Sequence, residues 1–170
     1  MNRKWLNNIP RDIGFYLSGF VDGEGSFNIS LRKKDDYHLG WQVVLSFNVS
    51  QKDPTLLYLL KRHLGCGIIK KRKDDELYSY DVTNPNSIIE RVIPFFKKFN
   101  FLSSSKKRNF SLFVKASKLM LDKEHLNEEG LREIVEIREK INIGAGRTRK
   151  YTIKDVFPSE ESSETTCQTL

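Results

Sequence analysis

The stretch Leu17-Ser18-Gly19-Phe20-Val21-Asp22-Gly23-Glu24-Gly25 constrains the fold of this chain more than any other. Apolar residues around it recur at helical spacing, which predicts a helix that begins near Pro10. The face expected to be buried comprises Ile13, Tyr16, Leu17, Phe20 and Val21. A second face, small in its middle, comprises Phe15, Ser18, Gly19 and Asp22. Because small residues let another backbone approach closely, this second face is a candidate helix–helix interface.

Glu24 lies between Gly23 and Gly25, just past the last turn of this predicted helix. A carboxylate is disfavoured there, because the C-terminal end of a helix already carries partial negative charge. The position becomes favourable if a cation is held there. Glu24 is therefore a candidate metal ligand, and the alternative is a solvated glutamate beside a glycine helix stop.

The same stretch, followed by Ser26-Phe27, resembles the signature of the LAGLIDADG homing endonucleases, DNA-cutting enzymes usually encoded within introns or inteins. The order of predicted elements extends the resemblance from about Ile13 to Tyr151. It implies an α+β fold of the type αββαββα, in which a four-stranded antiparallel, saddle-shaped sheet packs on helices and additional C-terminal helices follow. It also implies a catalytic metal site at Gly23 and Glu24, where many relatives have aspartate in place of Glu24.

The charge balance of the chain fits a nucleic-acid partner. The 170 residues carry a net charge of +7, and the last thirteen contain three glutamates and no lysine or arginine. Setting those three glutamates aside leaves +10 on residues 1–157. Such a basic domain favours a polyanionic partner, and a solvated basic surface is the alternative. We expect one domain over residues 1–157 and a flexible, polar acidic tail over residues 158–170.

The composition argues against several other classes of protein. Two cysteines cannot build a disulfide framework or a cysteine-rich zinc site, and the three histidines show no ligand spacing. No apolar run approaches the roughly 20 residues of a membrane span, and the N-terminus lacks the apolar stretch of a signal peptide. We expect an intracellular protein that has no membrane partner.

Hydrophobic periodicity and turn residues predict alternating strands and helices after the signature. The expected strands cover residues 26–33, 41–50, 68–72 and 77–83. The expected helices cover residues 55–64, 106–121 and 126–142, and a further helix starts at 84–87 and is interrupted or ended by Pro94. The chain contains no second copy of the signature.

The outer faces of these strands are candidates for reading DNA. Their inner faces are apolar, whereas the outer faces carry long or amide side chains that can address base edges in a major groove, namely Asn28, Ser30, Arg32, Gln42, Asn48, Lys70 and Arg72. A solvated sheet face would also be polar, but acids are scarce here. In the resembling family the sheet binds DNA, and Ser79 and Asp81 match its fourth strand. Lys33 and Lys34, with Lys71 and Lys73, are expected to contact phosphates.

Two further positions resemble the periphery of the family's active site. Gln51, at the end of the second strand, matches a polar residue that orders water near the metal. Lys106 matches a basic residue beyond the broken helix, and Lys98 and Lys107 are alternatives. The chain departs from some relatives at Thr55, where they place an arginine.

One signature copy is too little for a symmetric cut of two DNA strands, so we expect a homodimer. Two paired Glu24 carboxylates would repel each other unless a hard cation lies between them, and we expect Mg²⁺, for which Mn²⁺ substitutes. Three functions are compatible with these features. They are a site-specific double-strand DNA endonuclease with a near-palindromic target, an intron maturase that binds intron RNA, and a DNA-binding regulator that has lost cleavage.

Overall fold

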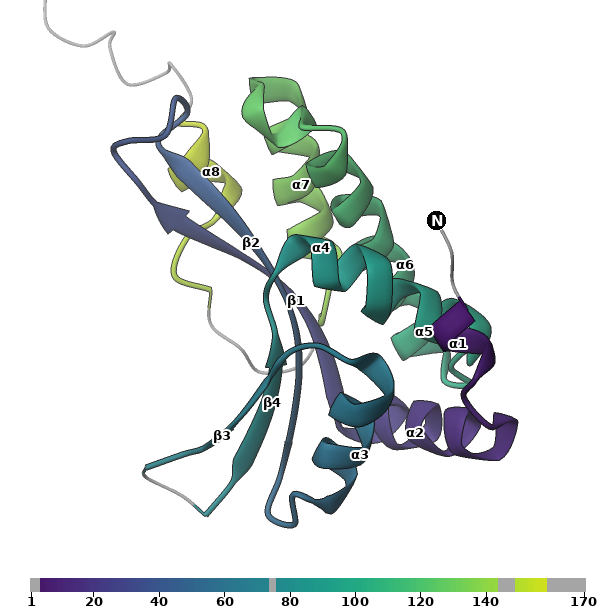
Figure 1. Ribbon diagram of the computed structural model, residues 1–170. Helices are drawn as coiled ribbons and strands as arrows, with labels where there is room; N and C mark the ends of the chain where they lie inside the picture. The colour runs from purple at the N-terminus through teal and green to yellow at the C-terminus, as the bar shows by residue number, and fades with distance from the viewer. Residues whose placement is uncertain (1–3, 74–75, 144–148, 159–170) are drawn as a thin grey trace, which may run out of the picture.

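Helices cover one face of a four-stranded antiparallel sheet in the computed structural model, which describes residues 4–73, 76–143 and 149–158 (Figure 1). The strands are β1 (Gly25–Lys33), β2 (Trp41–Gln51), β3 (Ile68–Lys71) and β4 (Tyr78–Val82), in the spatial order β1-β2-β4-β3. This arrangement confirms the predicted α+β class and its antiparallel sheet, and each strand lies within one residue of its expected bounds.

The strand β1 begins at the end of the signature and pairs with β2 over its whole length. Gly25 pairs with Val49 and Lys33 with Trp41, so β1 and β2 form one continuous hairpin. Strand residues alternate between the two faces, and the helix-covered face is almost wholly apolar. Phe27 lies at its centre, fully buried, and its ring contacts those of Phe47, Phe96, Phe101, Phe110 and Phe113.

The longer helices are α2 (Arg11–Glu24), α3 (Thr55–Leu64), α6 (Ser104–Leu121) and α7 (Glu128–Lys140). The bounds of α3 are those predicted from its flanking Pro54 and Gly65, and Gly65 ends the helix in the left-handed conformation. The helix expected at 126–142 is shorter, because the side chain of Asn127 caps it by accepting the Gly130 N–H at 2.8 Å. Three short elements were not predicted: α1 (Lys4–Asn7), η2 (Glu124–Leu126) and α8 (Ile153–Val156).

The buried face of α2 differs from the predicted one. Leu17 and Val21 are fully buried, but Tyr16 is 58% exposed, so its predicted burial was wrong. Gly14 is buried in its place, and a Cβ there would overlap the ring of Phe99. Because α2 approaches Phe99 this closely, the helix is rotated away from the face that apolar spacing alone selects. Glu24 was expected just past the last turn of the helix, but it is the last residue of the helix itself.

Pro94 neither interrupts nor ends its helix. The segments α4 (Pro85–Ser87), η1 (Ile88–Val92) and α5 (Ile93–Lys98) follow one another without a break, and η1 is a π-helix. The N–H of Ile93 donates to the carbonyl of Ile88, five residues earlier. This wider turn accommodates a proline that has no N–H to donate, and it keeps Phe95 and Phe96 in the core.

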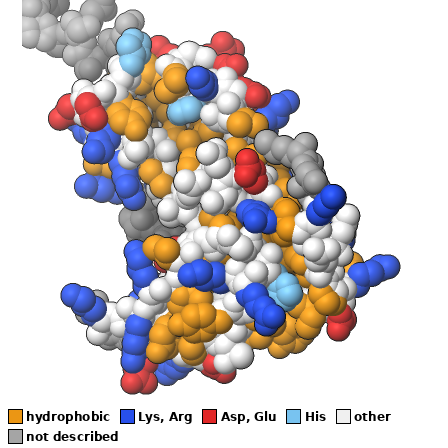
Figure 2. Space-filling model, in the orientation of Figure 1, with side chains coloured by type: hydrophobic (Ala, Val, Ile, Leu, Met, Phe, Trp, Pro, Cys, Tyr) orange, Lys and Arg blue, Asp and Glu red, His pale blue; other side chains and the backbone are white. Residues whose placement is uncertain are grey.

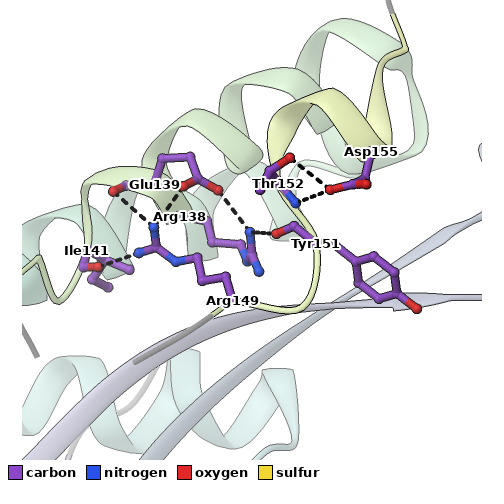
Figure 3. Close-up of polar contacts among 7 residues, drawn as sticks. All are labelled: Arg138, Glu139, Ile141, Arg149, Tyr151, Thr152 and Asp155. Carbon is purple, nitrogen blue, oxygen red and sulfur yellow. Dashed lines mark hydrogen bonds and ion pairs between the residues drawn. The ribbon is translucent and has the colours of Figure 1, made fainter. Parts of the chain in front are cut away.

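Two arginines, the buried Arg138 and the partly exposed Arg149, join the C-terminal residues of the described chain to α7 (Figure 3). Arg149 donates to Glu139 at 2.8 Å and to the carbonyl of Ile141 at 2.7 Å, and Arg138 donates to the carbonyl of Tyr151 at 2.8 Å. The ring of Tyr151 packs edge-on against Trp41, 4.8 Å between centroids. Residues 149–157 therefore pack as part of the domain, and the boundary at residue 157 stays a prediction. Except for Pro158, the predicted acidic tail lies outside the described residues.

Candidate active site and nucleic-acid interface

Glu24 ends α2 at the point where the chain enters the sheet. The N–H of Gly25 donates to the carbonyl of Val21, and β1 begins at Gly25 itself. The Glu24 side chain is exposed, and it makes no hydrogen bond or ion pair with the residues that the structure describes. A carboxylate and several carbonyl oxygens therefore meet at a helix C-terminus, where a cation is favoured.

Lys106 brings a positive charge to the same place. It lies in the first turn of α6, and its Nζ donates to the carbonyl of Gly25, the residue after Glu24. Burial lowers the pKa of Lys106 below its ordinary value, although the negative charges of Asp22 and Glu24 act in the opposite direction. The lysine thus lies within electrostatic reach of both acids of the signature.

The other two lysine candidates are placed differently. The Nζ of Lys98 donates to the carbonyl of Leu6 at 2.9 Å, so this side chain fixes α1 to α5. Lys107 follows Lys106 on α6, but its side chain is exposed and does not bond to Gly25. Lys106 is therefore the lysine that the fold brings to Glu24.

Asp22 fixes the start of α6 to the end of α2. Its carboxylate accepts the backbone N–H groups of Leu102 and Ser103, each at 2.9 Å, and also the hydroxyl of Ser103. Partial burial works against the ionised form, but the hydrogen bonds from Ser103 and Leu102 and the charge of Lys106 hold the pKa of Asp22 below its usual range. This link sets where Lys106 lies relative to Glu24.

Gln51 lies at the same end of the sheet. It is the last residue of β2, two positions beyond Val49, the partner of Gly25. On the opposite side of β2, Gln51 pairs with Tyr78 of β4. The antiparallel register therefore brings Gln51 alongside the last turn of α2, and its role near a metal stays a prediction.

The donor set suits a hard divalent cation but is incomplete in one chain. The candidate ligands, the Glu24 carboxylate and the Gly23 carbonyl, are oxygens, which Mg²⁺ and Ca²⁺ prefer. No group of three or more His, Cys, Asp or Glu side chains that could hold a metal occurs within residues 4–73, 76–143 and 149–158. Further oxygen ligands would have to come from a second chain, a phosphate group or water.

One face of α2 is open to such a partner. Gly19 and Gly23 are exposed, and a Cβ built at either residue would meet no atom within 4 Å. Phe15, 44% exposed, and Tyr16 flank this small surface, which we call the open face of α2. Phe15, Gly19 and Gly23 lie one helical turn apart, and together with the adjacent Tyr16 they form a surface that a second helix can approach closely.

The predicted interface needs correction at two positions. Ser18 is 1% exposed, and its hydroxyl donates to the carbonyl of Phe99 at 2.7 Å, inside the chain. The Asp22 carboxylate accepts hydrogen bonds from Leu102 and Ser103, which also lie inside the chain. Phe15 and Gly19 lie on the open face as expected, whereas Ser18 and Asp22 join α2 to the segment between α5 and α6.

The outer face of the sheet carries the polar residues expected to contact DNA. Alternation with the buried residues places most of them there, namely Asn28, Ser30, Arg32, Gln42, Asn48, Lys70, Ser79 and Asp81. Lys33 and Lys34 are exposed at the far end of β1, and Arg72 follows β3 and donates to Ser50 at 3.2 Å. Ser79 differs from the other residues of this face because it is buried.

The strand side of the molecule is rich in positive charge. Figure 2 shows Lys and Arg side chains along the left margin, from the β1–β2 hairpin down to β3 and β4. Such a stripe attracts the phosphates of a nucleic acid. None of the helices in the described parts of the chain is long and apolar enough to cross a membrane.

Comparison with known proteins agrees with this geometry. The family model for the LAGLIDADG endonuclease matches residues 17–117, from the signature helix to α6. The chain belongs to the LAGLIDADG endonuclease family. A probable intron-encoded endonuclease 3 of Neurospora crassa is 36% identical over 146 residues, which are 84% of this chain and 27% of that protein. The chain spans about a third or less of the length of the Neurospora relatives it matches.

Solved structures of LAGLIDADG endonucleases share the fold. I-SmaMI bound to an uncleaved DNA target in the presence of calcium ions superposes with a TM-score of 0.76 and 35% identity, over 85% of this chain and 48% of that chain. The homing endonuclease I-TnaI superposes with a TM-score of 0.72 and 31% identity, over 80% of this chain and 90% of that chain. The LAGLIDADG fold is therefore shared over most of the described residues.

Some residues of the site were missed by reasoning from sequence. The capping of α6 by Ser103 and the hydrogen bond of Ser103 to Asp22 were not predicted. A serine three residues before Lys106, at the start of a helical pattern, was the available signal. Asn142 donates to the carbonyl of Phe27 at 2.8 Å and so joins the end of α7 to β1, and no local pattern indicates that contact.

Proposed function

We propose that this chain acts as a site-specific double-strand DNA endonuclease. The observation that carries the proposal is the meeting of Glu24 and Lys106 at one end of α2, directly beside the strands with the polar outer face. An acid that can hold a cation and a lysine of lowered pKa are thus placed together where the sheet begins. This arrangement supports cleavage over mere binding, because a DNA-binding regulator needs neither group.

The residues of the chain divide the work of phosphodiester hydrolysis. The Glu24 carboxylate and the Gly23 carbonyl would hold Mg²⁺, for which Mn²⁺ would substitute. A bound divalent cation stabilises charge on the phosphate oxygens and lowers the pKa of a coordinated water. Lys106 adds positive charge near the scissile phosphate, and the Gln51 amide orients a water molecule by hydrogen bonding.

We infer that two copies of the chain form the active enzyme. Packing of the open face of α2 against its symmetry mate would bring two Glu24 carboxylates together and complete the metal site. A closed two-fold dimer presents two sheets in two-fold related orientations, so its target has two related half-sites and is nearly palindromic.

Double-stranded DNA is a better partner than RNA for this surface. The major groove of B-form DNA is wide enough for a two-stranded ribbon such as β1–β2, whereas that of an A-form RNA helix is deep and narrow. Binding to intron RNA would therefore use single-stranded regions or another surface of the chain. It would add to the nuclease activity without replacing it.

The test uses the full chain and a pool of double-stranded DNA with a randomised segment. Sites bound in Ca²⁺ are recovered and sequenced, cloned into a plasmid, and then incubated with the protein in Mg²⁺, in Mn²⁺ or in EDTA. We expect linear plasmid in both metals and none in EDTA. Recovered sites that are bound tightly but never cut in Mg²⁺ would leave a DNA-binding regulator as the better description.

A further inference from the structure

Three side chains on the outer face form a closed hydrogen-bond network, which we call the Asn48 cluster. It comprises Asn48 of β2 with Ser79 and Asp81 of β4. Asn48 lies directly opposite Asp81 in the register, and Ser79 lies one outward position along β4. Ser79 is 6% exposed, whereas Asn48 and Asp81 are partly exposed. Asn48 and Asp81 therefore present their remaining polar atoms to whatever contacts the sheet.

All strong donors of the cluster are used inside it. The Nδ2 of Asn48 donates one hydrogen to Ser79 Oγ, at 2.8 Å, and the other to Asp81 Oδ1. The Ser79 hydroxyl donates to Asp81 Oδ2 at 2.9 Å. An asparagine amide has two N–H donors and a serine one O–H donor, so no side-chain hydrogen remains for a ligand.

The network also fixes the orientation of the Asn48 amide. Rotating the amide by half a turn would place its oxygen against the Asp81 carboxylate, where two acceptors would repel each other. With Nδ2 turned toward Ser79 and Asp81, the Asn48 Oδ1 accepts no hydrogen bond from the cluster. The cluster thus offers a ligand the Asn48 oxygen, the further lone pairs of Asp81, and one negative charge.

A carboxylate on a DNA-facing surface needs a compensating partner. It repels phosphates, and no lysine or arginine among the described residues forms an ion pair with Asp81. Lys70 faces Ser79 across the register and is exposed. Its charge offsets the repulsion at long range but leaves the acceptor atoms uncovered. A hydrogen-bond donor on a base edge would satisfy them.

Base chemistry selects one such donor. In the major groove cytosine presents its N4 amino group, and its edge has no acceptor beside that group. Adenine presents an amino group next to the N7 acceptor, and guanine and thymine present acceptors that would face the cluster. An acceptor-only cluster attracts the first base and repels the last two, which is discrimination by both attraction and repulsion.

From this geometry we propose that the Asn48 cluster reads the N4 amino group of a cytosine at one fixed position in each half-site. The proposal rests on the proposed function, because it assumes that the outer face enters the major groove of a specific target. Asp81 and Asn48 are the specificity-determining residues, and Ser79 holds them in place. We expect cytosine to be preferred at this position by at least about fivefold in affinity.

The sites selected from the randomised pool test this inference and separate it from the proposed function. We expect one position per half-site to be cytosine in nearly all bound sequences. If the wild-type chain selects no sequence at all, the proposed site-specific function fails and the inference with it. If it selects a defined site in which no cytosine depends on Asp81, the function stands and the inference is overturned.

The decisive variant is Asp81→Asn, which keeps size but replaces a charged acceptor with an amide that can donate. Repeating the selection, we expect the cytosine preference to disappear at that one position in favour of guanine or thymine, with other positions unchanged. Glu136→Gln, which also replaces a carboxylate with an amide but lies exposed on α7, is the matched control and should retain the cytosine. The same selected sequence from Asp81→Asn and wild type would overturn the proposal.

A second measurement changes the DNA and leaves the protein intact, so it holds even if a variant fails to fold. The selected cytosine is replaced with the pyrimidin-2-one analogue, which lacks the N4 amino group, and wild-type binding is measured in Ca²⁺. We expect affinity to fall at least about fivefold. The analogue at a different cytosine of the site is the control, and unchanged affinity at the proposed position would contradict the inference.

Discussion

At the scale of single residues, Asp22 joins the two helices that carry the candidate catalytic groups. Its carboxylate accepts three hydrogen bonds from Leu102 and Ser103 at the start of α6. Because the folded state holds the pKa of Asp22 below its usual value, the ionised carboxylate stabilises the fold. This contribution is fully present above the pKa of the unfolded chain and is lost as pH falls through the folded pKa.

Asp22→Asn should therefore destabilise the chain at neutral pH by about 1 kcal/mol, since the carboxylate is largely exposed and its interactions are screened by solvent. The difference from wild type should shrink as pH falls below 4 and the wild-type carboxylate becomes protonated. Urea unfolding at pH 7, 5 and 3.5 measures it. Glu136→Gln, an exposed acid on α7, is the control and should show a much smaller difference. A pH-independent effect of Asp22→Asn would refute the linkage.

Lys106 is predicted to act as a cation near the scissile phosphate. Lys106→Met should lower the cleavage rate by about 10²- to 10³-fold and leave DNA binding in Ca²⁺ nearly unchanged. Lys107→Met, one position along α6, should cleave like wild type. If Lys106→Met also cleaves normally while remaining folded, the assignment of this lysine is wrong.

Burial of Lys106 makes a second prediction about pH. Because its pKa is lowered, its positive charge is lost at a lower pH than that of an ordinary lysine. Wild-type cleavage should fall as pH rises through that lowered pKa, and Lys106→Arg should shift the fall to higher pH. Rates measured at saturating DNA between pH 7 and 10 test this, and identical profiles for the two proteins would count against a charged role.

At the scale of elements, substitutions on the open face of α2 should change the association of two chains without changing the folding of either one. A side chain at Gly19 meets no atom of its own chain, so Gly19→Leu should fold normally. The same side chain would prevent two helices from approaching closely, and the dimer should dissociate at least about tenfold more readily. Gly19→Ala is the matched control, because it adds one methyl group and favours the helix. Light scattering and thermal unfolding measure both properties, and a Gly19→Leu dimer as stable as wild type would exclude this interface.

Sequence predicted the elements well where the signals are local. Pro54 and Gly65 bound α3 at the positions where the structure begins and ends it, and strand alternation placed β1 and β2 nearly exactly as observed. Prediction failed where contacts with a distant segment of the chain determine the local structure. The ring of Phe99 takes the position beside Gly14 that turns Tyr16 outward, and the π-helical turn before Pro94 depends on the packing of Phe95 and Phe96.

The candidate site was likewise predicted where the signal is local and was not predicted where it depends on a distant segment. Glu24 could be singled out from sequence because a carboxylate at a helix C-terminus is unusual wherever the rest of the chain lies. The choice among Lys98, Lys106 and Lys107 could not be made, because it depends on where α6 starts relative to α2. That geometry is set by Asp22 and Ser103, and their contact spans 81 residues of sequence.

At the scale of the whole molecule, the positive charge over the strands predicts strongly salt-dependent binding. Displacement of counterions from DNA by several lysines and arginines should lower affinity at least tenfold between 50 mM and 200 mM salt. Replacing both Lys33 and Lys34 with glutamine should reduce the slope of log affinity against log salt and weaken binding to specific and unrelated DNA alike. Gel-shift titrations at four salt concentrations measure the slope, and a slope near zero would contradict an electrostatic interface.

The central claim is that Glu24 holds the divalent cation used for cleavage, and Glu24→Gln tests it most directly. Gln keeps the shape of the side chain and removes its charge, while the outer face of the sheet is untouched. The measurement is paired: cleavage of a plasmid with the selected site in Mg²⁺, and gel-shift affinity for that site in Ca²⁺. We predict cleavage at background level with affinity retained or increased. Wild-type cleavage by a folded Glu24→Gln chain would contradict the account.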